Sequence, residues 1–150
     1  MAWQVTCLSL DAMSIQKIMT PDPLCIRPTS TMAEAARLMA EHDIGMLPVC
    51  EHDRLIGTVT DRDLVVRGLA QGADPNQAPV REVMTHEVVS CFEHQSIDEV
   101  CRVMGEKKIR RIPIVNDQMR LVGIVALGDI AVRTGSELRG GETLEQVSQP

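Results

Sequence analysis

Two groups of polar side chains in this sequence have the residue types and the spacing to bind a small ligand. The first is Thr60 and Asp63, a Thr-x-x-Asp motif that ends an apolar run. An ionised carboxylate can accept hydrogen bonds from two neighbouring hydroxyl groups, and such charge-assisted bonds are roughly twice as strong as neutral ones. The same motif also caps helices, where its oxygen atoms accept from free backbone N–H groups. A ligand contact and a helix cap are therefore both open interpretations of this pair.

The second group is the dense basic run at residues 107–111, which ends in Arg110 and Arg111. A guanidinium can bind a phosphate through two parallel hydrogen bonds. Because side chains alternate across a strand, we expect only one of the two arginines to point toward a ligand. For Lys107 and Lys108, a solvated charged edge is the simpler interpretation, and it is an alternative for the arginines as well.

An internal repeat indicates which elements position these residues. Residues 17–20 recur at 82–85, residues 44–49 at 109–114, and residues 55–63 at 121–129. A unit repeated at fixed spacing predicts two copies of one supersecondary structure that pack on each other. Each half is also a control for the other, because a residue that both halves keep is expected to serve the fold.

Each half has the pattern strand, helix, strand, strand, helix. The first helix of each half begins with a capping box, Thr31-x-x-Glu34 or Ser96-x-x-Glu99. Apolar residues at helical spacing then predict two buried stripes: Met32, Ala35, Ala36 and Met39, and Ile97, Val100, Cys101 and Met104. Apolar runs and polar turns predict the other elements: a short strand at 24–26, strand pairs at 47–50 with 55–60 and at 112–115 with 121–126, and closing helices at 61–69 and 128–133.

We therefore predict an α+β fold of tandem repeats with an internal pseudo-two-fold axis. The expected divisions are an N-terminal extension at 1–13, a first repeat at 14–69, a linker at 70–79, a second repeat at 80–133 and a polar C-terminal tail at 134–150. Neither repeat is long enough to build a comfortable core alone, so we expect the two sheets to pack face to face. A groove then follows the seam, and such concave seams are preferred ligand sites.

The composition argues against several functional classes. Trp3 and Phe92 are the only aromatic residues, which argues against a nucleic-acid binder that stacks bases on aromatic rings, as does the net charge of −6. Five cysteines without a C-x-x-C pair fit reduced cytosolic thiols rather than a disulfide framework. We see no signal peptide and no apolar stretch near the roughly 20 residues that span a bilayer. We therefore expect a cytoplasmic protein that binds neither nucleic acid nor a membrane.

The repeated segments resemble the CBS domain, a family named after cystathionine β-synthase, whose members occur in tandem pairs called Bateman modules. The resemblance lies in the Met-Thr openings at 19–20 and 84–85, the Pro-containing strands at 47–49 and 112–114, and the segment at 57–63. It extends over about residues 14–133. The stretch at 61–76 looks especially like small stand-alone bacterial proteins that are little more than one CBS pair.

The resemblance implies a non-catalytic regulatory or sensing module. Its usual ligands are adenosine-containing compounds such as AMP, ADP, ATP or NAD, bound between the two repeats. In members that bind nucleotides, the residue matching Asp63 accepts hydrogen bonds from the ribose hydroxyl groups and the residue matching Thr60 also contacts the ligand. The base would lie near Thr85 and Val88, between aliphatic side chains. Arg110 and Arg111 would line the cleft, where one of them could bind a phosphate.

The family arrangement also implies a second site, which would contain Thr20 and Asp129. Ala126 occupies the position that corresponds to Thr60, so Asp129 lacks a hydroxyl partner. We therefore expect this second site to be weaker or empty. The resemblance further implies a homodimer, and because the chain has no recognisable output domain, an unidentified effector protein is an expected partner.

Two other functions are alternatives to nucleotide sensing. One is a ligand-independent dimeric interaction or stress-response protein, in which Thr60 and Asp63 only cap a helix. The other is a metal- or redox-responsive switch, for which Cys50, His52 and His42 are the candidates for metal and Cys25 and Cys91 for redox chemistry. Without zinc-site spacing we predict no metal site, and we expect Cys25 and Cys91 to be buried as small apolar groups. We expect no catalytic residues and no catalytic cofactor, because no nucleophile–base set stands out.

Overall fold

The computed structural model describes residues 14–134 and 144–148. The predicted N-terminal extension lies outside the described residues, as does most of the predicted C-terminal tail. The fold is α+β and consists of two repeats, as the sequence predicts. In the described part of the chain, no helix combines the length and the apolar character needed to cross a bilayer.

The two repeats contain similar elements in the same order. The first contributes β1 (Thr20–Pro21), α1 (Met32–His42), β2 (Met46–Glu51), β3 (Arg54–Thr60) and α2 (Asp61–Asp63), which continues as a π-helix at Leu64–Gly68 and a 3-10 turn at Leu69–Gln71. The second contributes β4 (Cys91–Phe92), α3 (Ile97–Lys107), β5 (Arg111–Val115), β6 (Leu121–Ala126) and α4 (Leu127–Thr134). Short 3-10 turns at Ile15–Lys17 and Val80–Glu82 open the two repeats.

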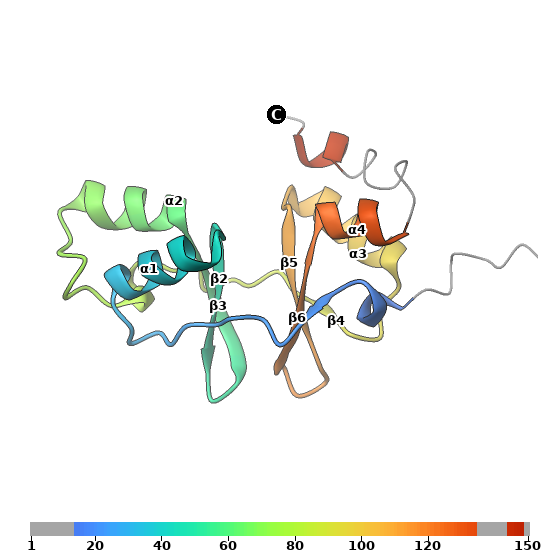
Figure 1. Ribbon diagram of the computed structural model, residues 1–150, viewed down its shortest axis with the longest axis horizontal. Helices are drawn as coiled ribbons and strands as arrows, with labels where there is room; N and C mark the ends of the chain where they lie inside the picture. The colour runs from blue at the N-terminus through green and yellow to red at the C-terminus, as the bar shows by residue number, and fades with distance from the viewer. Residues whose placement is uncertain (1–13, 135–143, 149–150) are drawn as a thin grey trace, which may run out of the picture.

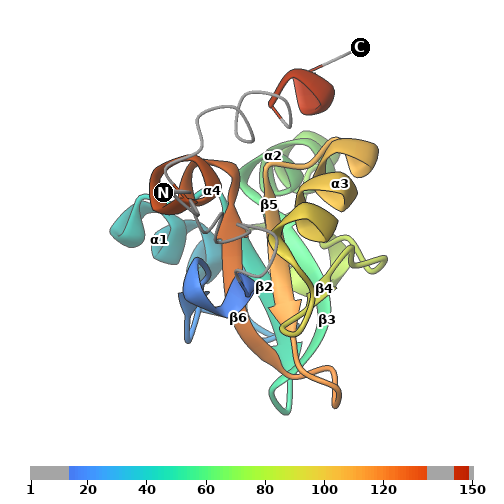
Figure 2. The ribbon, with the colours of Figure 1, turned by 90° about the vertical axis from the view of Figure 1, so that its right-hand side faces the viewer.

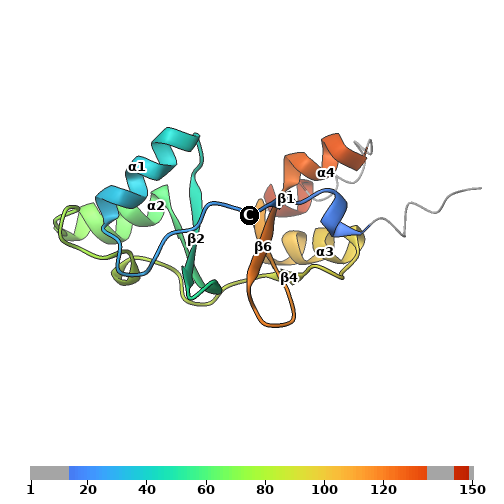
Figure 3. The ribbon, with the colours of Figure 1, turned by 60° about the horizontal axis from the view of Figure 1, so that its bottom comes forward.

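The repeats lie side by side, with their strands facing each other and their helices outside (Figure 1). β2 and β3 form one antiparallel hairpin, and β5 and β6 form the hairpin that faces it. The helices α1 and α2 cover the outer side of the first hairpin, and α3 and α4 cover that of the second, as Figures 2 and 3 show from other directions. The predicted packing of sheet against sheet is therefore correct.

The strand β1 joins the sheet of the other repeat, which the sequence did not indicate. Thr20 pairs with Ile124 and Pro21 with Gly123, so the second repeat has a four-stranded sheet in the order β1-β6-β5-β4. In the first repeat only β2 and β3 form a regular sheet. The beginning of the chain thus crosses the seam and ties the first repeat to the second, a path that is visible in Figure 1.

The short strand predicted at 24–26 is reduced to a single parallel bridge between Ile26 and Val49. Two hydrogen bonds of 2.9 Å hold this bridge, from Ile26 N–H to the Pro48 carbonyl and from Cys50 N–H to the Ile26 carbonyl. Pro23 and Pro28 flank the segment and have no N–H to donate to a ladder, which limits its length. The equivalent strand of the second repeat, β4, has two residues and pairs in parallel with β5.

Both predicted capping boxes are present. The Thr31 hydroxyl accepts from Glu34 N–H at 3.2 Å, and the Glu34 carboxylate accepts from Thr31 N–H at 2.8 Å. Ser96 and Glu99 repeat these two bonds at the same distances. One predicted stripe residue is wrong: Ala36 is exposed, whereas Met32, Ala35 and Met39 are buried. Ala36 lies at the edge of a narrow stripe, where a methyl group is too short to reach the core.

The core has two large clusters, and each is completed by the segment that opens the other repeat. Ile15 and Ile18 open the first repeat but pack in the cluster of the second, with Ile112. Val80 and Val83 open the second repeat but pack in the cluster of the first. A third, small cluster joins the repeats directly: Cys50, Leu55 and Val115, with Val88, Met119 and Leu121 packed against it. The two repeats therefore share one folded unit.

Candidate functional site

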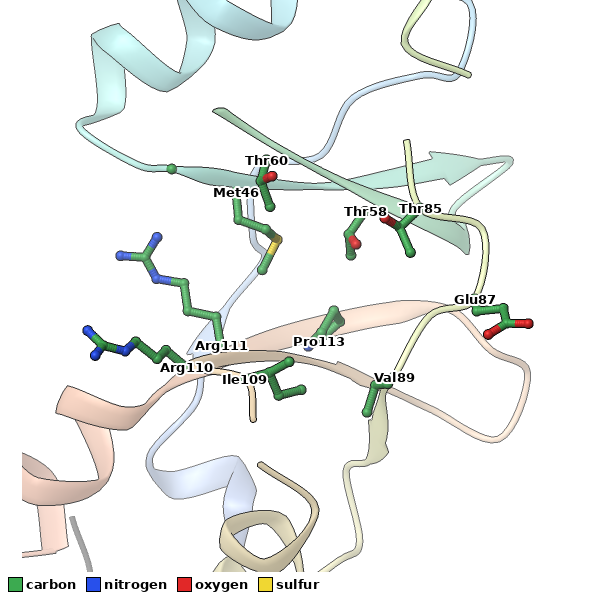
Figure 4. A pocket seen from close by; sticks show the side chains of 11 residues that line it. Met46, Thr58, Thr60, Thr85, Glu87, Val89, Ile109, Arg110, Arg111 and Pro113 are labelled. Atoms are coloured by element: carbon green, nitrogen blue, oxygen red, sulfur yellow. The ribbon is translucent and has the colours of Figure 1, made fainter. Parts of the chain in front are cut away.

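A cavity of about 540 Å³ lies at the seam between the repeats. Its lining comes from β2 and β3, from the segment that opens the second repeat, and from the start of β5: Gly45, Met46, Thr58, Thr60, Thr85, Glu87, Val89, Ile109, Arg110, Arg111 and Pro113. Figure 4 shows these side chains converging from both repeats. The volume lies within the range of about 300–1,000 Å³ that is usual for small-molecule sites.

The strand β3 and the opening of the second repeat are joined at the cavity by a reciprocal pair of backbone hydrogen bonds. Thr58 N–H donates to the Thr85 carbonyl at 3.0 Å, and Thr85 N–H donates to the Thr58 carbonyl at 2.8 Å. Successive outward positions of β3 bring Thr58 and Thr60 to the same side, as expected from the alternation of a strand. Three hydroxyl groups, from Thr58, Thr60 and Thr85, thereby line one cavity.

The positive and negative side chains of the cavity lie at opposite ends. Arg110 and Arg111 lie at one end and Glu87 lies at the other, with Thr58 and Thr85 between them (Figure 4). Both arginines line the cavity, and the expectation that only one of them points toward a ligand stays a prediction. Arg111 begins β5 whereas Arg110 precedes it, and the alternation of side chains applies only within a strand.

The remaining lining is mostly aliphatic. Met46 and Pro113 come from the two facing hairpins, while Val89 and Ile109 complete the wall on the side of the second repeat. The cavity thus offers hydroxyl groups, positive charge at one end and apolar walls. Among the described residues the one aromatic side chain, that of Phe92, is not part of the lining.

Asp63 is next to the cavity but serves first as a helix cap. Its Oδ2 atom accepts from Thr60 N–H at 2.9 Å, and its own N–H donates to Thr60 Oγ1 at 3.1 Å. The carboxylate is partly covered, with 14% of the side chain exposed, and its Oδ1 atom lies 3.6 Å from Arg67 Nε. Asp63 is not among the residues that line the cavity, although its capping partner Thr60 is.

Arg67 is a residue of this region that the sequence reasoning missed. Besides its ion pair with Asp63, its Nη1 atom donates to the carbonyl oxygens of Val83 and Met84, both at 3.3 Å, and to Thr85 Oγ1 at 3.2 Å. Arg67 therefore connects the cap of α2 to the segment that opens the second repeat. The spacing of Asp63 and Arg67, four residues apart on a helix, is the signal that could have found it.

The other predicted site residues lie elsewhere. Val88 packs against the small cluster of Cys50, Leu55 and Val115, and its neighbours Glu87 and Val89 line the cavity instead. Thr20 is exposed in β1, where its backbone pairs with Ile124. Asp129 accepts from Ala126 N–H at 3.1 Å, which is half of the reciprocal cap that Thr60 and Asp63 make. Neither Thr20 nor Asp129 lines this cavity.

The residues that were considered for metal or redox chemistry lie in separate places: Cys91 is in the core of the second repeat, whereas Cys25, Cys50 and His52 line a cavity of the first. Among the described residues, no group of three or more His, Cys, Asp and Glu side chains is arranged to hold a metal ion. Cys91 is buried, and burial raises the pKa of its thiol to about 11, with a contribution from the charge of Glu99. Cys25, in contrast, is exposed, because the irregular segment around it is not covered by a strand, so its predicted burial is wrong.

Comparison with known proteins identifies the family. The family model of the CBS domain matches residues 15–68 and again residues 80–133. The chain belongs to the CBS-domain family. Its tandem arrangement makes it a CBS pair, as the resemblance of the sequence implied.

Several small proteins share this organisation. The CBS domain-containing protein YhcV of Bacillus subtilis is 44% identical over 135 residues, which cover 90% of this chain and 95% of the relative. Hypoxic response protein 1 of Mycobacterium tuberculosis is 44% identical over 115 residues, which cover 76% of this chain and 80% of the relative. The expected likeness to small stand-alone CBS pairs is therefore confirmed.

Solved structures of related proteins have a similar fold. The crystal structure of Hypoxic Response Protein I with two coordinated zinc ions has a TM-score of 0.74 and 42% identity, and the match covers 79% of this chain and 97% of that one. The CBS domain pair of protein MJ0100, in complex with 5′-methylthioadenosine and S-adenosyl-L-methionine, has a TM-score of 0.71 and 31% identity, covering 83% and 98%. CBS pairs are regulatory modules, and some neighbours of this chain bind adenosine compounds.

Proposed function

We propose that this CBS pair is a non-catalytic regulatory module that binds an adenosine-containing ligand, such as AMP, ADP, ATP or NAD, in the cavity at the seam. The observation that carries the proposal is the division of the cavity between the repeats. The first repeat supplies the Thr60 hydroxyl beside the Asp63 carboxylate, and the second supplies two guanidinium groups, those of Arg110 and Arg111.

The chemistry of the cavity suits the parts of such a ligand. A phosphate at the end that carries the arginines could be bound by Arg110 or Arg111, because guanidinium and phosphate match in geometry. The base would lie between Met46, Val89 and Pro113. The MJ0100 pair, at 31% identity, supports an adenosine compound because its structure contains two such ligands.

Asp63 can cap α2 and bind ribose hydroxyl groups together. A carboxylate has about four acceptor sites on its two oxygen atoms. The bond from Thr60 N–H uses one site on Oδ2, and the 3.6 Å contact with Arg67 is long for a hydrogen bond to Oδ1. The carboxylate therefore keeps acceptor capacity for a diol, and the cap holds it in place.

A ligand that touches both repeats can change how they pack, provided that it binds one arrangement more tightly than another. The signal would then pass to a separate effector protein in the cytoplasm. The closing helices suit a homodimer, because they carry exposed apolar side chains: Val65 (54% exposed), Val66 (44%), Leu69 (53%) and Val132 (82%).

Equilibrium titration of the full chain with AMP, ATP, NAD and S-adenosylmethionine, together with thermal melting, tests the proposal. Asp63→Ala should abolish binding, whereas the matched variant Asp129→Ala should change it little, because neither Asp129 nor its capping partner Ala126 lines the cavity, while Thr60, the partner of Asp63, does. Arg111→Gln should weaken ligands with a phosphate more than S-adenosylmethionine. Absence of binding at millimolar ligand, with the protein folded, would refute nucleotide sensing.

One observation favours a second function, a ligand-independent dimeric interaction protein. The reciprocal bonds of 2.9 and 3.1 Å between Thr60 and Asp63 already explain why these residues are present. In that case Asp63→Asn should leave the dimer intact, and no nucleotide should shift the melting temperature.

A further inference from the structure

We propose that Cys25 and Cys50 are a modification site, at which oxidation by a small-molecule disulfide closes a reversible Cys25–Cys50 disulfide within one chain. The site is separate from the nucleotide cavity and does not depend on the proposed function. It lies at the bridge between Ile26 and Val49, where the segment before α1 runs beside β2.

The backbone places the two cysteines on adjacent strands. Cys25 directly precedes Ile26, and Cys50 directly follows Val49, the two bridged residues. The hydrogen bond of 2.9 Å from Cys50 N–H to the Ile26 carbonyl fixes the register. Ile26 and Val49 both pack into the core of the first repeat. Because side chains alternate along a strand, Cys25 and Cys50 are both directed to the opposite side of this bridge.

Both cysteines line a second cavity, of about 570 Å³, together with the turn at His52 and Asp53. Cys25 is exposed, whereas Cys50 is 5% exposed and packs with Leu55 and Val115 in the cluster between the repeats. An oxidant can therefore reach Cys25 from solvent, while Cys50 is shielded and lies behind it.

The thiols also interact with each other. Burial, together with the charge and a side-chain hydrogen bond of the neighbouring Cys25 and a smaller contribution from the charge of Asp53, raises the pKa of Cys50 to about 12. Cys50 is consequently a protonated thiol, and the sulfur of Cys25 lies next to it. This arrangement is that of an attacking cysteine backed by a resolving cysteine.

Two thiol–disulfide exchange steps form the Cys25–Cys50 disulfide, and a small disulfide is the only oxidant that they need. The Cys25 thiolate attacks one sulfur of a small disulfide such as oxidised glutathione, forming a mixed disulfide and releasing one thiolate. That thiolate or water takes the proton of Cys50, whose sulfur then attacks the Cys25 sulfur and releases the second glutathione. Two cysteine thiols are oxidised, and one oxidised glutathione is reduced to two molecules of glutathione.

A zinc site is the competing interpretation of two thiols beside His52. The described residues do not favour it, because no three potential ligands are arranged around a common point. Zinc is therefore included as an outcome of the test.

The disulfide would enclose α1, since residues 26–49 lie between the two cysteines. Closing a loop of this length restricts the unfolded chain. For a domain of this size we expect the melting temperature of the oxidised protein to be about 5–12 °C higher than that of the reduced protein.

The test uses the full chain, reduced, treated with EDTA and titrated with oxidised glutathione. Remaining thiols are then alkylated and the protein is mapped by mass spectrometry without reduction. We expect a Cys25–Cys50 cross-linked peptide, reversed by dithiothreitol. Cys50→Ser should instead stop at one glutathione on Cys25, and Cys101→Ser, the matched control, should form the cross-link as the wild type does.

Three results would overturn the proposal. One is a wild-type protein that retains glutathione on Cys25 while Cys50 stays a thiol. Another is a cross-link from Cys25 to Cys7, which lies outside the described residues, or to a second chain. The third, in a parallel sample that has not been treated with EDTA, is one tightly bound zinc per chain that protects both thiols from oxidation until EDTA is added. If Cys50→Ser does not fold, Cys25→Ser decides instead, because it should leave Cys50 unmodified by oxidised glutathione.

Discussion

Gly57 lies where β3 of the first repeat meets the segment that opens the second, and it has no room for a side chain. A Cβ atom at Gly57 would lie 2.8 Å from the Thr85 carbonyl oxygen and 3.0 Å from Met84 Cε. The carbonyl is backbone and is held by the Thr58–Thr85 hydrogen bonds, so it cannot turn aside as a side chain can. We therefore expect Gly57→Ala to push the two repeats apart at the edge of the cavity at the seam.

The loss of stability in Gly57→Ala can be worked out from the displacement of Thr85. Displacing Thr85 weakens two backbone hydrogen bonds, each with a net contribution of about 0.5–1.5 kcal/mol. Overpacking of a close contact independently costs about 1–3 kcal/mol. Both routes indicate a loss of about 1–3 kcal/mol in the free energy of unfolding. At about 2–4 °C per kcal/mol, the melting temperature should fall by roughly 2–12 °C.

Urea unfolding and calorimetry of three Gly→Ala variants measure this effect. Gly123 is the repeat counterpart of Gly57, but its Cβ would meet the Met19 side chain, which can move, so the loss should be smaller. Gly128 in α4 has no atom within 4 Å of the added Cβ, and Ala there should stabilise the helix by up to about 1 kcal/mol. The reasoning is refuted if Gly57→Ala remains within about 0.5 kcal/mol of the wild type.

Three further predictions concern pH, the cavity and assembly. The bond from Ser96 N–H holds the pKa of Glu99 below its ordinary value of 4.5, so its stabilisation is complete above about pH 4.5 and is lost as pH falls through the lowered pKa. Glu99→Gln should thus flatten the acid side of a urea-midpoint profile, and an unchanged slope would contradict this. Arg67→Ala should weaken nucleotide binding several-fold in calorimetric titration, whereas the exposed control Arg62→Ala should not. Leu69→Lys should shift a dimer toward monomer in analytical ultracentrifugation without lowering the melting temperature of the monomer, because 53% of this side chain is exposed.

The sequence predicts those elements whose signals are local. The capping boxes of α1 and α3 depend on residues three positions apart, and both form as expected. The hairpins β2–β3 and β5–β6 follow from apolar runs separated by polar turns. The edge strand β1 could not be found in this way, because it has two residues, one of them proline, and its pairing with β6 is decided by contacts across the seam.

In the site, too, the sequence does not predict features that depend on contacts between distant segments. The sequence singled out Thr60, Arg110 and Arg111, and all three line the cavity, whereas Asp63 lies beside it. Val88 and Val89 look alike in the sequence, and only the path of the irregular segment decides that Val89 faces the cavity while Val88 packs in the cluster with Val115. The spacing of Cys25 and Cys50 likewise carries no signal until the bridge between Ile26 and Val49 brings their strands together.

The exchange of opening segments explains how such a small protein could act as a sensor. Ile15 and Ile18 complete the core of the second repeat, and Val80 and Val83 complete that of the first, so neither repeat has a full core of its own. The segment that carries Val83 continues directly into Thr85, which is held to β3 and lines the cavity. A ligand that displaces Thr85 would therefore act on the same segment that joins the two cores. Because packed cores adopt discrete arrangements rather than deforming continuously, a small shift at the cavity can change the packing of both repeats.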